Sequence, residues 1–179
     1  MQEFEFLILN AIQNLRCGFV DALMVFFTTL GEWGAVWIFL GVTLLFFKKY
    51  RRLGAIILLG LLVGLVTVNL GIKNIVARPR PCSLNPDIEL IIPFPSEYSF
   101  PSGHTVSSFS AATSVFLNNR KMGAFALSLA AVIAFSRMYL YVHFPTDILG
   151  GIVIGVAISF FATWLFGLCC EKKSNKIDG

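Results

Sequence analysis

The chain has 179 residues, of which 56% are hydrophobic and 13% are charged, and its formal net charge is +4. Its mean hydropathy of +0.78 is far above that of an ordinary soluble domain. The length suits one domain or one compact helix bundle. These totals exclude an ordinary soluble protein and favour an integral membrane protein, with the bilayer and not a nucleic acid as its surroundings.

The first part of the chain precedes the clear membrane segments. Phe4–Leu15 carries apolar residues at helical spacing, with Glu3 and Glu5 at its start, which predicts an interfacial amphipathic helix. Residues 21–30 are apolar but too short to span alone, so a sixth span over residues 18–40, broken at Gly31, stays open. The chain starts with acidic residues and shows no basic segment before an apolar one, so we expect no cleavable signal peptide.

Five later segments are candidates for membrane-spanning helices, which need about 20 apolar residues. They are Trp33–Phe47, Leu53–Ile72, Thr105–Leu117, Met122–Val142 and Ile148–Leu168. The first and third are short, so their ends should extend into flanking residues. The sequence predicts an all-α, polytopic transmembrane helix bundle with five spans. We expect a single membrane-integral domain over residues 1–179, with interfacial or half-spanning helices in 1–31, a transmembrane core in 33–168 and a cytoplasmic tail in 169–179.

The basic residues divide between the two faces of this bundle. Nine of the fourteen fall on one face: Lys48, Lys49, Arg51, Arg52, Arg120, Lys121, Lys172, Lys173 and Lys176. Because cytoplasmic loops are rich in Lys and Arg, this face and the C-terminus should be cytoplasmic. The other five lie on or just within the opposite, outer face: Arg16, Lys73, Arg78, Arg80 and Arg137. We expect a multi-pass protein of the plasma or inner membrane.

Three polar clusters meet at the outer face if the spans alternate. They are KNIVARPRP (Lys73–Pro81), PSGH (Pro101–His104) and SRMYLYVHFPTD (Ser136–Asp147). Basic side chains at helix ends often only anchor the protein to lipid headgroups. That role does not explain why both histidines of the chain fall in these clusters, or why Asp147 follows His143 by four residues. Several ionisable groups near hydrocarbon indicate a functional site.

The residue types in these clusters suit a phosphate group. Lys73, Arg80 and Arg137 can clamp a tetrahedral anion, because arginine donates in a fixed fork and lysine adds a compact charge. Ser102 is a good N-cap residue, and Gly103 lets the backbone approach closely at a helix N-terminus that favours an anion. The stretch PSGH therefore predicts a helix start that holds an anion.

The two histidines and Asp147 can supply the chemistry. A neutral His143 could attack phosphorus if its second ring nitrogen donates to Asp147. Pro145 and Asp147 are typical of the first turn of a helix, which would place the pair at its mouth. His104 is then the proton donor to the leaving oxygen.

With these residues in place, the sequence resembles the type 2 phosphatidic acid phosphatases, also called lipid phosphate phosphatases. Their signature, K-x6-R-P, then P-S-G-H, then S-R-x5-H-x3-D, is filled by three sets of residues. These are Lys73, Arg80 and Pro81; Pro101 to His104; and Ser136, Arg137, His143 and Asp147. The resemblance implies an acid phosphatase/vanadium haloperoxidase-like helical core. It implies a phosphohistidine on His143 oriented by Asp147, proton donation by His104, and phosphate binding by Lys73, Arg80, Ser102, Gly103 and Arg137. It also implies that the enzyme needs no metal and no cofactor. Vanadium haloperoxidases share the signature, but a membrane bundle argues against that activity.

The substrate is less well defined than the chemistry. Bacterial proteins that look like this one act on undecaprenyl pyrophosphate, on phosphatidylglycerophosphate or phosphatidate, or on lipid A phosphates. The short connections leave little protein for a sugar-rich headgroup, so undecaprenyl pyrophosphate is our first hypothesis and lipid A our last. A lipid phosphotransferase with the same histidine, or a transporter or binding protein that only holds the lipid phosphate, are the alternatives. The oligomeric state cannot be predicted.

Several other residues allow two interpretations. Arg78 could meet the second phosphate of a pyrophosphate or face lipid headgroups. The aromatic residues of the loop Cys82–Phe100, which are Phe94, Tyr98 and Phe100, could form a lid or lie in the membrane interface. Gly150, Gly151 and Gly155 indicate close helix packing. A Cys17–Cys82 disulfide is one option, while Cys169 and Cys170 are packing residues or lipidation sites.

Overall fold

The computed structural model describes the backbone of residues 2–174 and the side chains of residues 2–168. This part of the chain is helical and contains no strand, which confirms the all-α prediction. The helices are α1 (Gln2–Gln13), α2 (Gly18–Gly31), α3 (Ala35–Leu45), α4 (Arg51–Gly64), α5 (Lys73–Val76), α6 (Pro81–Leu84), α7 (Gly103–Asn118), α8 (Arg120–Tyr139) and α9 (Pro145–Ser174). A 3₁₀ turn, η1 (Glu32–Gly34), joins α2 to α3, and a π-helical stretch, η2 (Leu65–Ile72), joins α4 to α5.

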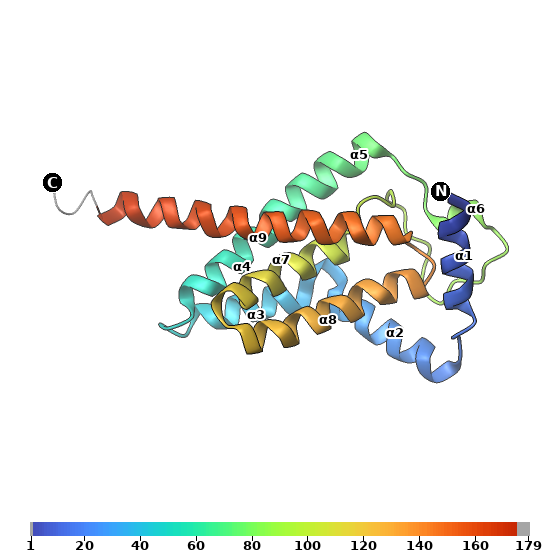
Figure 1. Cartoon of the computed structure of the whole chain (residues 1–179), viewed down its shortest axis with the longest axis horizontal. Coiled ribbons are helices and arrows are strands. Elements are labelled where there is room, and N and C mark those ends of the chain that lie inside the picture. Colours follow the sequence, from blue (N-terminus) through green and yellow to red (C-terminus); the bar gives the residue numbers. More distant parts are fainter. Residues whose placement is uncertain (1, 175–179) are drawn as a thin grey trace.

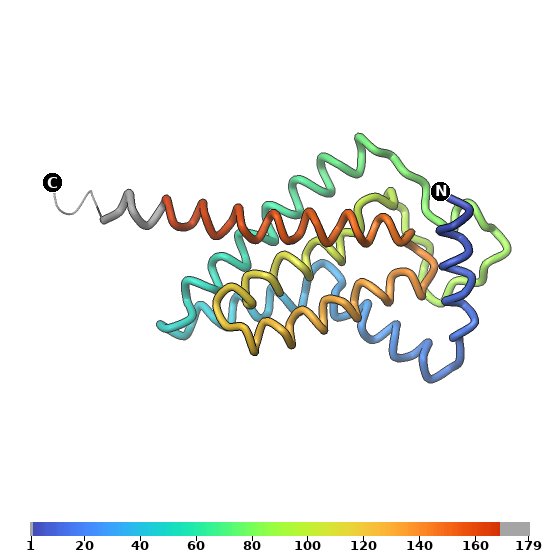
Figure 2. The backbone as a smooth tube through the Cα atoms, in the orientation of Figure 1, coloured from blue at the N-terminus to red at the C-terminus, as the bar shows by residue number. Residues whose placement is uncertain are grey.

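The long helices run roughly along the long axis of the molecule, and α1 lies across one end of the bundle (Figures 1 and 2). Helix α7 occupies the centre, where it packs against α4, α8 and α9. The end that α1 crosses also holds α5, α6, the beginnings of α7 and α9 and the end of α8 (Figure 1). Chain topology therefore brings distant segments of the sequence to this one end.

Four helical segments are long and apolar enough to cross a membrane: Gly18–Leu45, Arg51–Leu84, Arg120–Tyr139 and Pro145–Leu168. Helix α7 has 16 residues, less than the roughly 20 that a bilayer core requires. It lies between the long helices, where its buried face includes many Ser, Thr and Ala side chains. The structure thus shows a polytopic membrane bundle, and the total of five spans stays a prediction.

The expected start of the first span at Trp33 was wrong. Helix α2, η1 and α3 together form one kinked candidate span that begins at Gly18 and includes residues 18–40. Helix α2 ends at Gly31, where the break was expected. At the kink Trp33 has φ 53° and Gly34 has φ 71°, left-handed values that glycine adopts without a steric cost.

The kink also sets how closely α2 approaches the start of α7. A Cβ atom added to Gly31 would lie 2.7 Å from Cγ2 of Ile133 and 3.0 Å from Cδ2 of His104. Any larger residue at Gly31 would push α2 away from His104. The kinked first span therefore forms one wall beside a predicted site residue.

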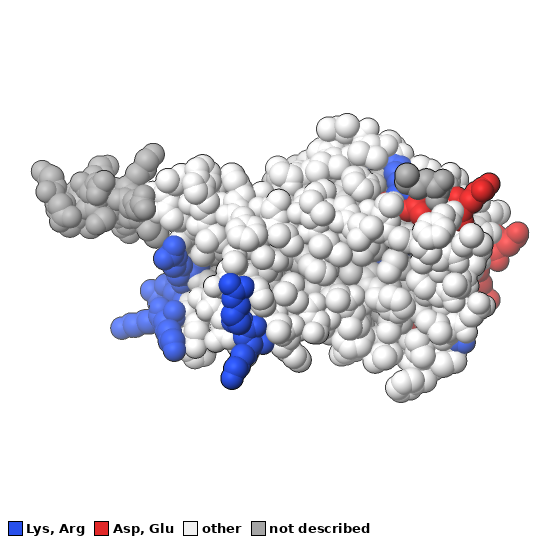
Figure 3. All heavy atoms as spheres, viewed as in Figure 1, with Lys and Arg blue, Asp and Glu red and all other residues white. Residues whose placement is uncertain are grey.

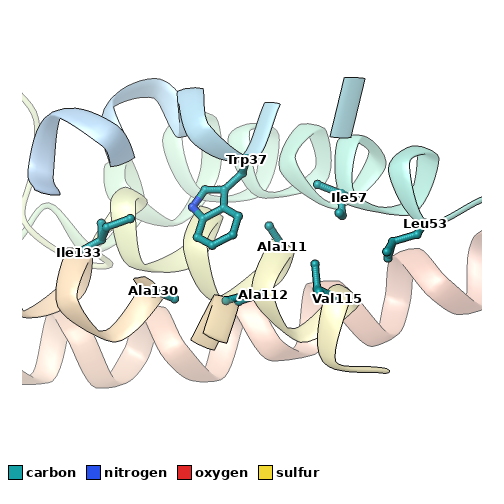
Figure 4. Close-up of a cluster of buried hydrophobic side chains, with 9 residues drawn as sticks. Trp37, Leu53, Ile57, Ala111, Ala112, Val115, Ala130 and Ile133 are labelled. Carbon is teal, nitrogen blue, oxygen red and sulfur yellow. The ribbon is translucent and has the colours of Figure 1, made fainter. Parts of the chain in front are cut away.

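One hydrophobic cluster holds α3, α4, α7 and α8 together (Figure 4). The fully buried Trp37 contributes its ring, and its Nε1 donates a hydrogen bond of 2.9 Å to Oγ of Ser108. Ala111 and Ala112 of α7 face this cluster, so their small side chains allow the neighbouring helices to pack closely. This apolar core makes a rigid base for the polar end of the bundle.

The predicted close packing at the glycines of α9 is confirmed. An added Cβ would lie 2.9 Å from Cβ of Thr105 at Gly151, and 2.7 Å from the Val106 carbonyl oxygen at Gly155. The suggested disulfide is not formed, since Cys17 is an exposed free thiol and Cys82 a buried one. The expectations for Cys169, Cys170, Lys172, Lys173, Lys176 and the cytoplasmic tail concern side chains outside the described residues.

Candidate active site

All eight predicted site residues lie at the end of the bundle that α1 crosses. Lys73 opens α5, Arg80 precedes α6, Arg137 is in the last turn of α8 and Asp147 is in the first turn of α9. Six of the eight are buried and at most 6% exposed: Lys73, Arg80, Ser102, Arg137, His143 and Asp147. Gly103 and His104 are partly buried. Such a density of buried polar groups needs mutual hydrogen bonds or a bound partner.

His143 sits in the short loop between α8 and α9. Nη1 of Arg80 lies 3.1 Å from its Nε2. A guanidinium can only donate, so Nε2 accepts this bond with its lone pair, which leaves the ring proton on Nδ1. Burial lowers the pKa of the His143 imidazole to about 3. The histidine is therefore neutral at physiological pH, with its basic nitrogen turned toward the cations.

The other ring nitrogen of His143 faces Asp147, but less directly than expected. Nδ1 lies 3.6 Å from Oδ2 of Asp147, which is beyond hydrogen-bond distance. The hydroxyl of Ser99 lies beside both atoms, 3.5 Å from Nδ1, and donates a hydrogen bond of 2.5 Å to Oδ2. The amide of Phe144 also donates to Oδ2, at 2.8 Å. The expected pair is thus a group of three side chains, and sequence reasoning missed Ser99.

The stretch PSGH forms a helix start, as predicted. Ser102 is the N-cap of α7, and its Oγ accepts bonds from the amide of Thr105 at 3.4 Å and from its hydroxyl at 2.9 Å. The amide of Ser102 donates to the carbonyl oxygen of Asp147 at 3.2 Å, which ties the start of α7 to α9. A Cβ atom on Gly103 would lie 3.9 Å from Nζ of Lys73. The lysine therefore reaches the N-terminus of α7, where an anion would be stabilised.

Two buried guanidinium groups lie beside this helix start. Nε of Arg80 donates to the carbonyl oxygen of Glu97 at 2.7 Å, and its Nη1 donates to that of Val142 at 2.8 Å. Arg137 donates through Nη1 to Oγ1 of Thr28 in α2. Its buried Nε has no hydrogen-bond partner among the described residues. Within the part of the chain that the structure describes, neither arginine forms an ion pair with a carboxylate.

These cations repel one another and disfavour a charged His104. The positive charges of Arg80 and Arg137 repel the ammonium group of Lys73, and the charge of Arg137 also opposes protonation of His104. Lys73 forms an ion pair with Glu97, whose side chain is half exposed. A buried charge without a counter-ion is costly, and a bound anion removes that cost. The arrangement is that of an anion site with a neutral histidine at its edge.

Arg78 contacts two protein carboxylates. Its Nη2 lies 2.6 Å from Oε2 of Glu5 and its Nη1 lies 2.6 Å from Oδ1 of Asp147. The two roles suggested from the sequence, contact with a second phosphate or with lipid headgroups, stay predictions. No feature of the sequence pointed to the pairing with Glu5, which lies 73 residues away on another helix.

The three aromatic residues of the loop before PSGH differ in exposure, and their role as a lid or as interface anchors stays a prediction. Phe100 packs inward, and a Cβ atom on Gly150 would lie 2.5 Å from its ring. Phe94 and Tyr98 are exposed. Tyr98 borders a hollow of about 320 Å³, which is also lined by Asn69, Lys73, Asn74, Ser96 and Glu97. This hollow opens beside Lys73. No group of three or more His, Cys, Asp or Glu side chains is placed to hold a metal ion in the described ranges.

In the described residues, a helical membrane bundle holds a neutral buried histidine beside guanidinium groups that have no carboxylate partner. This arrangement is typical of a protein that binds phosphate and transfers a phosphoryl group. Residues 49–169 match the family model of the PAP2 superfamily. Over 159 residues the chain is 31% identical to an undecaprenyl-diphosphatase of Sulfolobus acidocaldarius, covering 88% of this chain and 76% of the relative. It is 29% identical to the undecaprenyl-diphosphatase BcrC of Bacillus subtilis, covering 79% of this chain and 72% of the relative. The chain belongs to the PAP2 superfamily.

Solved structures agree with this assignment. The crystal structure of Aquifex aeolicus LpxE superposes with a TM-score of 0.71 at 29% identity, covering 88% of this chain and 93% of that one. A PAP2-type phosphatidylglycerolphosphate phosphatase from Bacillus subtilis has the same fold, with a TM-score of 0.77, 24% identity, and 92% and 85% of the two chains covered. The protein is therefore a multi-pass membrane phosphatase.

Proposed function

We propose that the protein hydrolyses undecaprenyl pyrophosphate to undecaprenyl phosphate and inorganic phosphate, at the outer face of the cell membrane. One observation supports this most directly: the unprotonated Nε2 of His143 lies 3.1 Å from a buried guanidinium that has no carboxylate partner among the described residues. A nucleophile is thus held at the edge of a group of cations that can bind an anion. The two undecaprenyl-diphosphatases among the relatives favour this lipid class.

The first half-reaction transfers the terminal phosphoryl group to the enzyme. Lys73, Arg80, Arg137, the hydroxyl of Ser102 and the backbone at Gly103 bind the phosphate oxygens. The lone pair of His143 Nε2 attacks phosphorus and forms a P–N bond, while the P–O bond to the bridging oxygen breaks. His104 donates a proton to the departing lipid phosphate. The guanidinium groups stabilise the charge that develops on the transferred group.

The second half-reaction returns the enzyme to its starting state. His104, now neutral, accepts a proton from a water molecule whose oxygen attacks phosphorus. The P–N bond breaks, its electron pair returns to Nε2 of His143, and inorganic phosphate leaves. Asp147 and Ser99 keep the proton on Nδ1 through both steps, so Nε2 remains the reacting atom. Burial, together with the charges of Arg137 and Lys73, lowers the pKa of the His104 imidazole, and a negative phosphate beside it would favour the imidazolium. Binding of the substrate phosphate should therefore be coupled to protonation of His104.

The charge distribution supports an outward-facing site. Lys48, Lys49, Arg51 and Arg52 flank the α3–α4 connection, and Arg120 and Lys121 begin α8. Both regions lie at the end of the bundle opposite the site, where blue side chains gather in Figure 3. The positive-inside rule makes that end cytoplasmic.

Two other lipid phosphates have support as substrates. A lipid A 4'-phosphatase of Porphyromonas gingivalis is 31% identical over 97% of this chain and 80% of its own length. The phosphatidylglycerophosphatase B of Bacillus subtilis matches a shorter region, at 34% identity over 36% of this chain. A phosphotransferase would share the first half-reaction and replace water by a lipid or sugar hydroxyl.

Phosphate release by purified protein in detergent with excess EDTA tests the proposal. Undecaprenyl pyrophosphate, phosphatidylglycerophosphate, phosphatidate and lipid A are compared at equal detergent fractions, with His143→Ala as the matched control. We expect the highest kcat/KM with undecaprenyl pyrophosphate and no release by the variant. Release from another lipid at a higher kcat/KM would overturn the substrate, and undiminished release by His143→Ala would overturn the mechanism. Phosphate that appears on an added acceptor and not in solution would establish a transferase.

A further inference from the structure

A buried carboxylate on α1 contacts the first turn of α9. Glu5 is only 4% exposed, although α1 lies across the outside of the bundle (Figure 1). Its Oε1 accepts hydrogen bonds from Thr146, at 2.5 Å from the hydroxyl and 3.2 Å from the backbone amide. Its Oε2 pairs with Nη2 of Arg78 at 2.6 Å. Both carboxylate oxygens of Glu5 therefore accept hydrogen bonds, one from Thr146, which precedes Asp147 in the chain, and one from Arg78, which contacts Asp147.

Arg78 connects this carboxylate to Asp147. Its Nη1 donates to Oδ1 of Asp147 at 2.6 Å and to the Thr146 hydroxyl at 2.7 Å. Its guanidinium lies over the ring of Phe144, 4.2 Å from the centroid. The Phe144 ring therefore packs against one face of the planar Arg78 guanidinium, and a carboxylate binds each of its two terminal nitrogens. Asp147 receives a bond to Oδ1 on this side and bonds to Oδ2 from Ser99 and Phe144 on the other.

We propose that Glu5 and Arg78 are positioning residues for Asp147, so that the amphipathic helix α1 sets the orientation of the His143 ring. The proposal rests on the proposed function in one respect, namely that His143 is the nucleophile whose tautomer matters. The hydrogen bonds of both residues go to each other, to Thr146 and to Asp147, and not to Lys73, Arg80, Ser102 or Arg137. Both residues act through the carboxylate that faces His143 Nδ1.

Packing alone does not account for Glu5. Leu9 of α1 is fully buried in an apolar cluster that also holds Tyr139, Leu140, Val142 and Phe144, so α1 already has an apolar contact with the bundle. Burying a carboxylate beside that cluster carries a desolvation cost, and replacing a buried ion pair by apolar groups is often neutral or stabilising. What the pair provides is a fixed geometry, because the planar guanidinium bridges the two carboxylates through different nitrogens and so defines where one oxygen of each lies.

The experiment compares Glu5→Gln, Arg78→Lys and Arg78→Gln with the unaltered protein, and uses Glu3→Gln as a control. Glu3 is an exposed carboxylate two residues from Glu5 on the same helix. With undecaprenyl pyrophosphate, we expect kcat to fall about tenfold for Glu5→Gln, since one charge-assisted contact in the chain to Asp147 is lost. KM should stay within about twofold, because the phosphate contacts remain. Arg78→Lys should keep more activity than Arg78→Gln, and Glu3→Gln should match the unaltered protein.

A second measurement does not depend on turnover. The chain has two histidines, so ¹⁵N-histidine spectra contain two rings, and His104→Asn identifies the signals of His143. We expect the Nδ1–H tautomer of His143 with one sharp Nδ1 signal in the unaltered protein and in Glu3→Gln. In Glu5→Gln and Arg78→Gln the Nδ1 signal should shift or broaden, because Asp147 is no longer held against that side of the ring, while Arg80 still donates to Nε2. An unchanged Nδ1 signal in both variants would overturn the proposal, as would a kcat equal to that of the unaltered protein. If the unaltered protein hydrolyses none of the lipids, the proposed function fails, while the Nδ1 signal still decides the positioning role. If Glu5→Gln does not fold, Arg78→Lys gives the same two readouts.

Discussion

Two groups of buried charges lie at the same end of this bundle and are treated in opposite ways. Around Asp147, every charge has a partner: Arg78 bridges Glu5 and Asp147, each at 2.6 Å. Around the start of α7, Arg80 and Arg137 are as deeply buried, yet in the described part of the chain no carboxylate pairs with them. The difference separates two tasks. Charges that are paired within the protein hold side chains in a fixed geometry. Cations without a partner within the protein can instead bind the anionic group of a substrate.

The largest expected effect is on the uncompensated side. Arg137→Gln should lower kcat/KM for the lipid pyrophosphate by about 10²- to 10³-fold, because a donor to the transferred phosphoryl group is lost. The same change should leave the thermal stability of the phosphate-free protein equal or higher, since it removes a buried charge without a counter-ion. Steady-state kinetics and thermal unfolding in one detergent check both halves. A clear loss of stability would show that Arg137 has a structural partner.

The compensated side should respond in the opposite sense. Arg78→Gln leaves two neighbouring carboxylates without their shared cation, and we expect the free energy of unfolding to fall by about 3 kcal/mol. Thermal unfolding of Arg78→Gln and Arg137→Gln, measured side by side, gives the comparison directly. Equal stability changes in the two variants would remove the distinction between the two groups of charges.

Ser99 contacts both His143 and the compensated carboxylate of Asp147 through its hydroxyl. Ser99→Ala removes a hydrogen bond to a charged group, so we expect kcat to fall about tenfold with little change in KM. Ser99→Thr keeps the hydroxyl and should retain most of the activity. Full activity of Ser99→Ala would show that Asp147 holds the histidine without help from the serine.

Among the described residues, Glu97 is the carboxylate that pairs with Lys73, the third cation beside Arg80 and Arg137. Its ion pair with Lys73 competes with the substrate phosphate, so Glu97→Gln should lower KM. The effect should be at most about fivefold, because a half-exposed ion pair contributes little. A raised KM would instead show that Glu97 helps to hold Lys73 in position.

The smallest expected effect is an absence of titration. Burial lowers the pKa of His143 to about 3, so the neutral form prevails above that pH and is lost only as the pH falls toward 3. The ¹⁵N signals of His143 in the phosphate-free protein should therefore stay constant between about pH 5 and pH 8, where an ordinary histidine titrates near 6.5. A transition near pH 6.5 would contradict a buried neutral nucleophile.

The helical fold and the residues that meet at one end of the bundle could be predicted from the sequence. The predicted site residues lie at helix ends or in the short loop between α8 and α9, and alternating helices carry such ends to one face of the bundle. The N-cap at Ser102 follows from a local rule, and the glycines of α9 pack as a small-residue pattern indicates.

The rest depends on contacts that have no signature in the sequence. Ser99 and Glu97 lie in an irregular loop, where residue spacing does not fix side-chain direction. Glu5 meets Arg78 across 73 residues, and its position at the start of an amphipathic helix is equally typical of a solvated face. The kink at Trp33 and Gly34 and the π-helical stretch η2 reflect tertiary packing, which overrides the regular helical period.

The central claim is that His143 carries the phosphoryl group. The most direct measurement is to mix the protein with undecaprenyl pyrophosphate labelled with ³²P at the terminal phosphate, quench within the first turnover, and map the labelled peptide. We predict a label that is stable to alkali and labile to acid, located on the peptide that contains His143, and absent from His143→Asn. A label on any other residue, or phosphate release by His143→Asn at the rate of the unaltered protein, would contradict the account.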